Sequence, residues 1–306
     1  MPKLTRFDGN PIISPRKDQA WEDGGTFNPG AVIDGGAVRL LYRAVDANGV
    51  SRLGYAQTLD GRSLSFRSSA PVLAPSTKSE EFGCEDPRII PFEGTFYVTY
   101  TAYSRRGPRI ALASTKNFHN FVKLGLIGPD RNDKDCVIFP ERIKGRITVL
   151  HRLESKVQVA YFDSFESLAD SRDYWSEYVR HFDDYEVMKA KFSWEKRKVG
   201  VGPPPVKTDR GWLVIYHGVS IDRIYRAGAL LLDLDEPGKV VARTKEPILE
   251  PVMDFEREGV VPNVVFPDGA VVLNGELLCY YGGADKVCCV ASAPIDEFLD
   301  ELEKEA

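Results

Sequence analysis

Apolar and polar positions along this 306-residue chain follow one pattern that recurs five times. In each copy, a glycine is followed by a run of β-branched, aromatic and other apolar residues, and most of these runs end in polar ones. Runs of this kind predict β-strands. A long period built from strands is typical of a β-propeller. The runs are 36–43, 94–100, 145–152, 211–218 and 275–282, so their glycines stand 58, 51, 66 and 64 residues apart.

A proline-marked segment precedes each run. Because proline cannot donate to a ladder hydrogen bond, it marks strand starts and unpaired edges. We therefore expect these segments to be the innermost strands of five blades, with the glycine-led runs as second strands. Polar neighbours of the prolines would then converge on the central axis. These neighbours are Asn28, Asp86, Glu141, Lys207 and Asn263, beside Pro29, Pro87, Pro140, Pro204–Pro205 and Pro262.

The remaining segments complete the blades. Third strands are predicted at 52–57, 109–114, 157–162, 225–232 and 286–291, and outer strands at 71–75 and 247–251. An aromatic, charged insertion at 164–191 is predicted to be helical, and an apolar stripe within 294–305 predicts an amphipathic C-terminal helix. The expected fold is all-β: a five-bladed β-propeller with a short helical insertion and a C-terminal helix, as a single domain over 1–306.

Composition narrows the ligand classes. The net charge of −5 and pI of about 5.6 argue against a general grip on nucleic acid or an acidic membrane, so an anionic ligand would need local cations. No run approaches the length of a membrane span, and no apolar leader is visible. Five cysteines without a C-x-x-C pattern predict reduced thiols and a cytoplasmic location. Four histidines without a zinc motif predict no metal site.

The sharpest local motif is Gly-Cys-Glu-Asp-Pro-Arg at 83–88. Adjacent residues of a strand point to opposite faces, so only one of Glu85 and Asp86 should face the channel. We expect Asp86, because a residue before proline is biased towards an extended conformation that projects its side chain. The alternative is an Asp-Pro turn in which Arg88 is a salt-bridge partner.

Basic residues recur where second strands end. Arg43 and Arg152 each stand seven positions after their glycine, and His151 and His217 occupy similar places. Strand ends of a propeller face the same rim, so these groups, with Lys207, could bind one anion; arginine offers a fork that matches phosphate oxygens. The alternative is a set of scattered surface charges. Asp285 is either part of a turn or a carboxylate that binds sugar hydroxyls.

In this order, the motifs resemble glycoside hydrolase family 130, the β-mannoside phosphorylases and related β-mannosidases. The resemblance implies a five-bladed β-propeller and inverting, reversible phosphorolysis of β-mannosidic bonds to α-mannose 1-phosphate. It implies that Asp86 is the catalytic acid, which protonates the glycosidic oxygen through the mannose 3-hydroxyl. The motifs are 27–30, 85–88, 150–152, 202–205 with Lys207, 216–218 and 280–285.

The same resemblance implies roles for further residues. Phosphate-binding positions are matched by Arg152, Lys207, His217 and Tyr225. Asn28, Arg43 and Asp285 match positions near the mannose, and we place Arg88 and His151 in the same substrate-binding set. Inorganic phosphate would be a co-substrate, with no other cofactor and no metal, and the partners would be a β-mannooligosaccharide and phosphate.

Several alternatives stay open at this stage. Related hydrolases replace the phosphate-binding positions, so the intact basic set favours a phosphorylase, and a non-catalytic sugar-binding propeller is less favoured. Short loops near 47–48 and 105–107 favour β-1,2-linked substrates over β-1,4-linked mannosides of mannose, glucose or N-acetylglucosamine. The aromatic insertion around Trp175 is either a homo-oligomer interface or a cap on its blade.

Overall fold

In the computed structural model, which describes residues 1–306, the glycine-led runs form the second strands of five antiparallel groups. The first group is β2 (Gly25–Asp34), β3 (Ala37–Val45), β4 (Ser51–Thr58) and β5 (Leu64–Arg67). The second is β6 (Gly83–Phe92), β7 (Thr95–Ser104), β8 (Gly107–Thr115) and β9 (Phe121–Leu126). The third is β10 (Lys134–Ile138), β11 (Ile147–Leu153), β12 (Lys156–Phe162) and β13 (Glu186–Met188).

The fourth group contains β14 (Lys198–Val201), β16 (Trp212–Val219), β17 (Tyr225–Leu232) and β18 (Val240–Arg243), with the short β15 (Val206–Lys207) also paired to β16. The fifth contains β19 (Val265–Leu273), β20 (Glu276–Gly283) and β21 (Val287–Pro294). Its fourth strand is β1 (Thr5–Arg6), so the two ends of the chain meet in one sheet. A parallel pairing of Ser51 with Gly83 joins the first two groups.

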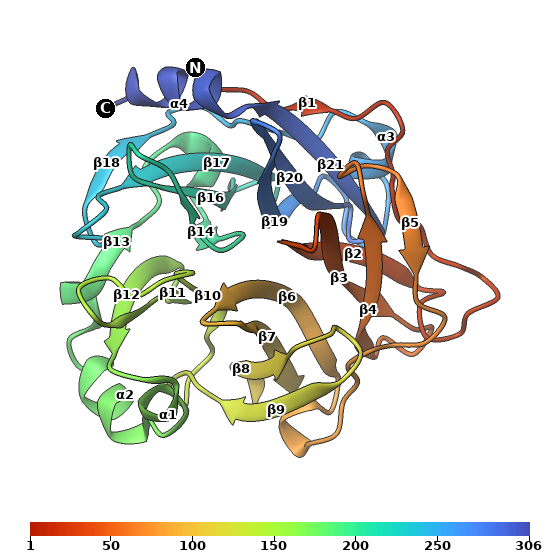
Figure 1. Ribbon diagram of the computed structural model, residues 1–306, viewed down its shortest axis with the longest axis horizontal. Coiled ribbons are helices and arrows are strands. Elements are labelled where there is room, and N and C mark those ends of the chain that lie inside the picture. The colour runs from red at the N-terminus through yellow and green to blue at the C-terminus, as the bar shows by residue number, and fades with distance from the viewer.

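Figure 1 shows the groups following one another around a ring, with β2, β6, β10, β14 and β19 nearest its centre. The predicted all-β class is confirmed, and the helices are few. Helices α1 (Phe165–Ala169) and α2 (Arg172–Tyr178) lie in the insertion between β12 and β13, and α4 (Ile295–Glu303) follows the last strand as predicted. The others are α3 (Asp254–Arg257) and the 3-10 turns Lys78–Glu80, Phe182–Tyr185 and Ser193–Glu195. None of the helices is long and apolar enough to cross a membrane.

The prolines of the inner strands do not mark strand starts. Pro29 and Pro87 lie inside β2 and β6, where the pairing register breaks. A β-bulge leaves a residue outside the ladder, so the missing N–H of proline costs no hydrogen bond there. The preceding residues, Asn28 and Asp86, have φ angles of 50° and 51° instead of the expected extended conformation. The bulge therefore decides where these two side chains point.

Two other strand predictions are corrected. In the fifth group the register breaks between Pro267 and Gly269, inside β19, while Pro262 precedes that strand. The outermost strands of the first and fourth groups are β5 and β18, whereas 71–75 and 247–251 contribute only the single bridges Leu73–Leu53 and Leu249–Ala227. Proline-flanked segments this short pair for too few residues to make a strand.

In four of the groups, a buried glutamate connects the second strand with the outermost strand. In each case it accepts a hydrogen bond of 2.8–2.9 Å from a second-strand tyrosine and pairs with a cation from the outermost strand. Buried charges are stable only when they are paired in this way. We call these sets the glutamate locks: Glu22–Tyr42–Arg67, Glu80–Tyr100–Lys123, Glu195–Tyr216–Arg243 and Glu256–Tyr281–Arg6.

The third group replaces the lock with a histidine. His151 is fully buried, with Nδ1 at 2.8 Å from an oxygen of Asp133 and Nε2 at 3.0 Å from the hydroxyl of Tyr178 in the helical insertion. Its position on the second strand corresponds to that of the lock tyrosines. His151 therefore holds the insertion against the sheet, and the structure does not place it among substrate-binding residues.

The apolar core lies between neighbouring groups. One cluster joins β16 and β17 to β20, β21 and α4, and another joins the third group to the fourth through residues such as Val137, Leu150, Val199 and Val214. Because the apolar side chains pack between neighbouring sheets, polar side chains of the inner strands occupy the centre of the ring.

Candidate active site

A cavity of about 100 Å³ collects polar side chains from all five groups. Most of its lining residues are charged or aromatic, and most come from the inner strands or the ends of second strands. The cavity is therefore enclosed and lined by both acidic and basic side chains. Its lining is Asn28, Arg43, Asp86, Lys134, Asp135, Arg152, Lys198, His217, Tyr225, Val261, Val264, Phe266 and Asp285.

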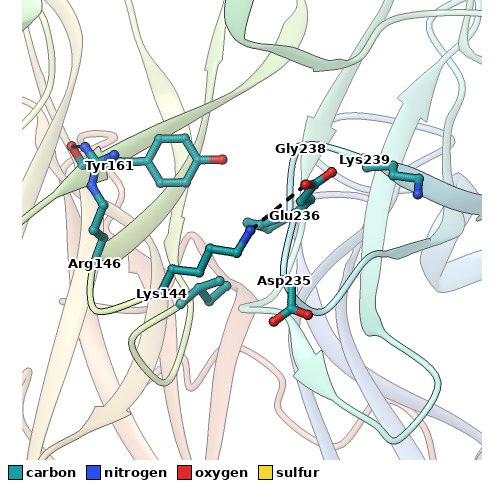
Figure 2. Close-up of a pocket in the computed structure, with 9 residues that line it drawn as sticks. Lys144, Arg146, Tyr161, Asp235, Glu236, Gly238 and Lys239 are labelled. Atoms are coloured by element: carbon teal, nitrogen blue, oxygen red, sulfur yellow. Dashed lines mark hydrogen bonds and ion pairs between the residues drawn. The ribbon is translucent and has the colours of Figure 1, made fainter.

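A larger cavity, of about 440 Å³, lies between residues 143–146 of the third group and 235–239 of the fourth. Figure 2 shows Lys144 reaching across it towards Glu236. These two charges are 4.0 Å apart, and each side chain is more than half exposed. Exposed pairs of this kind contribute little energy, and no buried acid lines the space. The central cavity is therefore the candidate active site.

Asp86 is the acid at the centre of this site. Its side chain is 2% exposed, and Oδ1 accepts a hydrogen bond of 2.7 Å from the amide of Asn28. Arg43 Nη1 lies 3.4 Å from Oδ1 and Lys134 Nζ lies 3.5 Å from Oδ2. Burial alone would raise the pKa of Asp86, but the charges of Lys134 and Arg43 outweigh it and lower the pKa to about 2.

Glu85 contacts the same Arg43 but does not line the cavity, so Asp86 is the one of the two adjacent acids that faces it, as expected. The Oε1 atom of Glu85 lies 2.7 Å from Arg43 Nη2. The bulge at Asp86 and Pro87 breaks the alternation of side chains, so both carboxylates reach one guanidinium. Burial raises the pKa of Glu85, and Asp86 adds to this effect.

Asp285 combines both interpretations of its motif, because it lies in a turn and lines the cavity. Ala284 and Asp285 have φ angles of 48° and 51° between β20 and β21. Burial, the largest cause, raises the pKa of Asp285 to about 6; the nearby Asp86 acts in the same direction, while Arg43 opposes it. A half-buried carboxyl that titrates near neutrality can accept hydrogen bonds from sugar hydroxyls or donate one to them.

The opposite side of the cavity is basic. Arg152 Nε lies 2.9 Å from Asp135 Oδ2, and His217 Nε2 lies 3.7 Å from the same oxygen. Lys198 Nζ stands 5.0 Å above the ring of Tyr225. Neither ring nitrogen of the buried His217 has a hydrogen-bond partner in the protein. This side therefore offers unused donors to an anion.

The titration of these groups reflects their crowding. Burial and the charge of Arg152 lower the pKa of Lys198 to about 8. Burial holds the pKa of His217 well below its usual range, so the ring is neutral at pH 7. Like charges held together without a full set of acidic partners are stabilised when an anion binds between them.

The position of Lys207 along the sheet differs from the one that we predicted. Lys207 pairs with Trp212, whereas His217 is five residues further along β16 and faces Gly200. At about 3.3 Å per residue, this separates the two by roughly 16 Å. Lys207 is half exposed and forms a 2.6 Å ion pair with Glu141, so neither reaches the cavity. The structure thus places Lys207 outside the cavity that collects Arg152, His217 and Tyr225.

Arg88, which we placed in the substrate-binding set, does not line the cavity either. It is 1% exposed and lies beneath the cavity, where it pairs with Asp268 and Asp135. No group of three or more His, Cys, Asp or Glu side chains is arranged to hold a metal ion.

The structure adds Lys134, Asp135 and Lys198 to the site. Their sequence signal is weak: Lys134 and Asp135 belong to the charged segment 130–135, and Lys198 to the basic segment 196–198. Asp135 has a φ of 56° at a register break in β10, which parallels Asp86 in β6. Alignment of the inner strands by their bulges could have identified it.

Comparison with known proteins agrees with this geometry. The model of glycoside hydrolase family 130, described as beta-1,4-mannooligosaccharide phosphorylase, matches residues 11–304. A 1,2-beta-oligomannan phosphorylase of Thermoanaerobacter sp. strain X514 is 39% identical, covering 95% of this chain and 97% of its own. A beta-1,4-mannooligosaccharide phosphorylase of Ruminococcus albus is 32% identical, covering 98% and 91%.

Among solved structures, the beta-1,2-mannobiose phosphorylase of Listeria innocua in complex with beta-1,2-mannobiose superposes with a TM-score of 0.84. The two are 28% identical, and the match covers 99% of both chains. The family match spans nearly the whole chain and includes every strand that contributes to the cavity. This chain belongs to glycoside hydrolase family 130.

Proposed function

We propose that this chain is an inverting phosphorylase that cleaves β-mannosidic bonds reversibly with inorganic phosphate and releases α-mannose 1-phosphate. The observation that carries the proposal is the juxtaposition of the buried acid Asp86 with Lys134, Arg152 and Lys198 in a single small cavity. We further propose that residues 1–306 form one domain, a five-bladed β-propeller, in which each strand group is a blade.

The two sides of the cavity would have separate tasks. Asn28, Arg43 and Asp285 would hold the mannose beside Asp86, which supplies the proton for the leaving oxygen through the mannose 3-hydroxyl. Arg152, Lys198, His217 and Tyr225 would hold phosphate for attack at the anomeric carbon. Phosphate is already a nucleophile, so this reaction needs positioning and charge stabilisation but no general base.

Phosphate also has a role in the protonation of Asp86. In the free protein, Lys134 and Arg43 keep this carboxyl ionised, which is the wrong state for an acid. A phosphate dianion near Lys134 and Arg152 would offset these positive charges and raise the pKa of Asp86. Binding of the co-substrate would then prepare the acid for proton transfer.

The β-1,2 linkage is the favoured substrate class. The relative at 39% identity is named for 1,2-beta-oligomannan and the one at 32% for beta-1,4-mannooligosaccharide. This difference supports β-1,2-linked mannooligosaccharides as substrates for the present chain.

The second candidate function is hydrolysis of the same bond, and the position of Asp285 is the observation that favours it. Inverting hydrolysis needs a second carboxyl to activate water. Asp285 lines the same cavity and is half-buried, and its pKa of about 6 suits a base. The basic side of the cavity favours phosphorolysis, because water would not need it.

Product analysis tests the proposal. Purified protein would be incubated with β-1,2-mannobiose, β-1,4-mannobiose or β-1,4-mannosyl-glucose, each with and without inorganic phosphate. Mannose 1-phosphate formed only with phosphate, and most rapidly from β-1,2-mannobiose, is the expected result. Free mannose formed without phosphate would instead show a hydrolase, and turnover of the β-1,4 substrates alone would refute the linkage.

The proposal includes phosphate as co-substrate, with no metal or organic cofactor. The cytoplasmic location stays a prediction; all five cysteines are buried and none forms a disulfide. The helical insertion packs against its own sheet through Trp175 and Tyr178, which supports its interpretation as a cap on the third blade.

A further inference from the structure

The guanidinium of Arg88 reaches from the second group to residues of the third, fourth and fifth groups. Its Nε donates to the carbonyl of Gly202 at 2.9 Å, and its Nη2 donates to the carbonyl of Val201 at 3.3 Å, both in the fourth group. Its Nη2 lies 2.7 Å from Asp268 in the fifth group and 3.4 Å from Asp135 in the third. Arg88, which belongs to the second group, therefore contacts residues of three other strand groups.

The first group approaches the same point through its backbone. A Cβ atom added to Gly30 of β2 would lie 2.2 Å from the carbonyl oxygen of Pro87 and 3.4 Å from Cα of Arg88. Only glycine permits this approach. The backbone at Pro87 and Arg88 thus packs against the first group, while the Arg88 side chain contacts the third, fourth and fifth groups.

The carboxylate of Asp268 makes its polar contact with Arg88 alone. It is fully buried, accepts no hydrogen bond from any other group, and forms its one ion pair with Arg88. A buried guanidinium is costly unless a carboxylate compensates it. Asp268 therefore sets where the Arg88 side chain can lie.

Two contacts connect Arg88 to the reacting groups. Its Nη1 donates to the backbone carbonyl of Asp86 at 2.8 Å, which holds a residue whose φ of 51° is unfavourable for a non-glycine residue. On the other side it contacts Asp135, whose second oxygen lies 2.9 Å from Arg152. Arg88 thus bridges the acid and the anion-binding side of the cavity.

We propose that Arg88, held in place by Asp268, is a positioning residue that fixes the distance between Asp86 and the phosphate-binding groups. This inference rests on the proposed phosphorolysis. Arg88 touches neither sugar nor phosphate, because it lies below the cavity. Its effect on the rate is through geometry, and a misplacement of about 1 Å between reacting groups can cost roughly 100-fold in rate.

The first test uses Asp268→Asn, which keeps the shape of the side chain and removes its charge. We expect kcat for phosphorolysis to fall by about 10- to 100-fold while the KM values for phosphate and β-1,2-mannobiose change little, since no ligand contact is lost. Arg88→Lys, which keeps the charge but loses the planar fork, should behave in the same way. A wild-type kcat in Asp268→Asn would overturn the inference.

The double variant Arg88→Met/Asp268→Leu separates positioning from folding. Replacement of a buried ion pair by apolar residues of similar volume is often neutral for stability, whereas loss of one partner is not. The double variant should regain the melting temperature that Asp268→Asn loses, but its kcat should stay low because the carbonyl of Asp86 has lost its donor. Recovery of kcat together with stability would show that Arg88 is only structural.

These outcomes are separable from failure of the proposed function. A wild-type protein that makes no mannose 1-phosphate would refute the phosphorylase proposal and this inference with it. An active wild type together with a fully active Asp268→Asn would refute the inference alone.

Discussion

Replacement of Lys134 by methionine should change the pH dependence of catalysis. Lys134 Nζ lies 3.5 Å from Oδ2 of Asp86, whose side chain is 2% exposed. At this distance two unit charges interact with about 5 kcal/mol at an effective dielectric constant of about 20. Measured effects of such a neighbour are smaller, and an opposite charge typically lowers a carboxyl pKa by about 1 to 3. Lys134→Met should therefore raise the pKa of Asp86 by an amount in that range.

The sign of the effect follows from the role of Asp86 as an acid. The protonated form is active, so kcat falls as pH rises through the pKa of Asp86 in the phosphate complex. A higher pKa moves this alkaline limb to higher pH. Lys134 also lines the cavity, where it would lie near the bound phosphate, so the KM for phosphate should increase in the same variant.

The assay is the pH profile of kcat at saturating phosphate and β-1,2-mannobiose for wild type and Lys134→Met. Lys144→Met is the matched control, because the Lys144 side chain is 62% exposed at the other cavity and should leave both the profile and the KM for phosphate unchanged. An alkaline limb that does not move in Lys134→Met, despite a higher KM, would refute the argument that Lys134 sets the protonation of Asp86.

Three further predictions test separate parts of the structure. Asp86→Asn should lower kcat by about 10²- to 10⁴-fold, the usual contribution of a general acid, with the melting temperature retained; near-normal turnover would remove Asp86 from the mechanism. Lys198→Ala should raise the KM for phosphate by about tenfold or more, as expected when a charged hydrogen bond is lost, whereas Lys207→Ala, whose ammonium pairs with Glu141 in solvent, should leave it nearly unchanged; equal effects would contradict the placement of the anion. Glu195→Gln should destabilise the fold by about 3 kcal/mol, because Arg243 loses its buried partner, and thermal unfolding of this variant beside the exposed control Glu141→Gln would measure it; equal melting temperatures would show that the glutamate locks are not stabilising.

The strand order and several site residues could be predicted from the sequence alone. Strand periodicity and glycine turns are local signals, so the repeat spacing indicated the second strands, and the C-terminal helix followed from its apolar stripe. Arg43, Arg152 and His217 were predicted to gather because they end second strands, and the structure brings them to one cavity. Asp86 was predicted from its motif, although its local conformation was not.

What only the tertiary structure decided is which polar residues of the inner segments reach the cavity. Lys198 and Lys207 lie nine positions apart in one segment, yet only Lys198 lines the site. Arg88 resembles a ligand-binding residue in its motif but is buried beneath the cavity, and His151 is used to hold the insertion. The physical reason is that the depth and direction of an inner-strand side chain depend on bulges and on pairing with strands far away in the sequence, and a shift of one residue reverses the face to which it points.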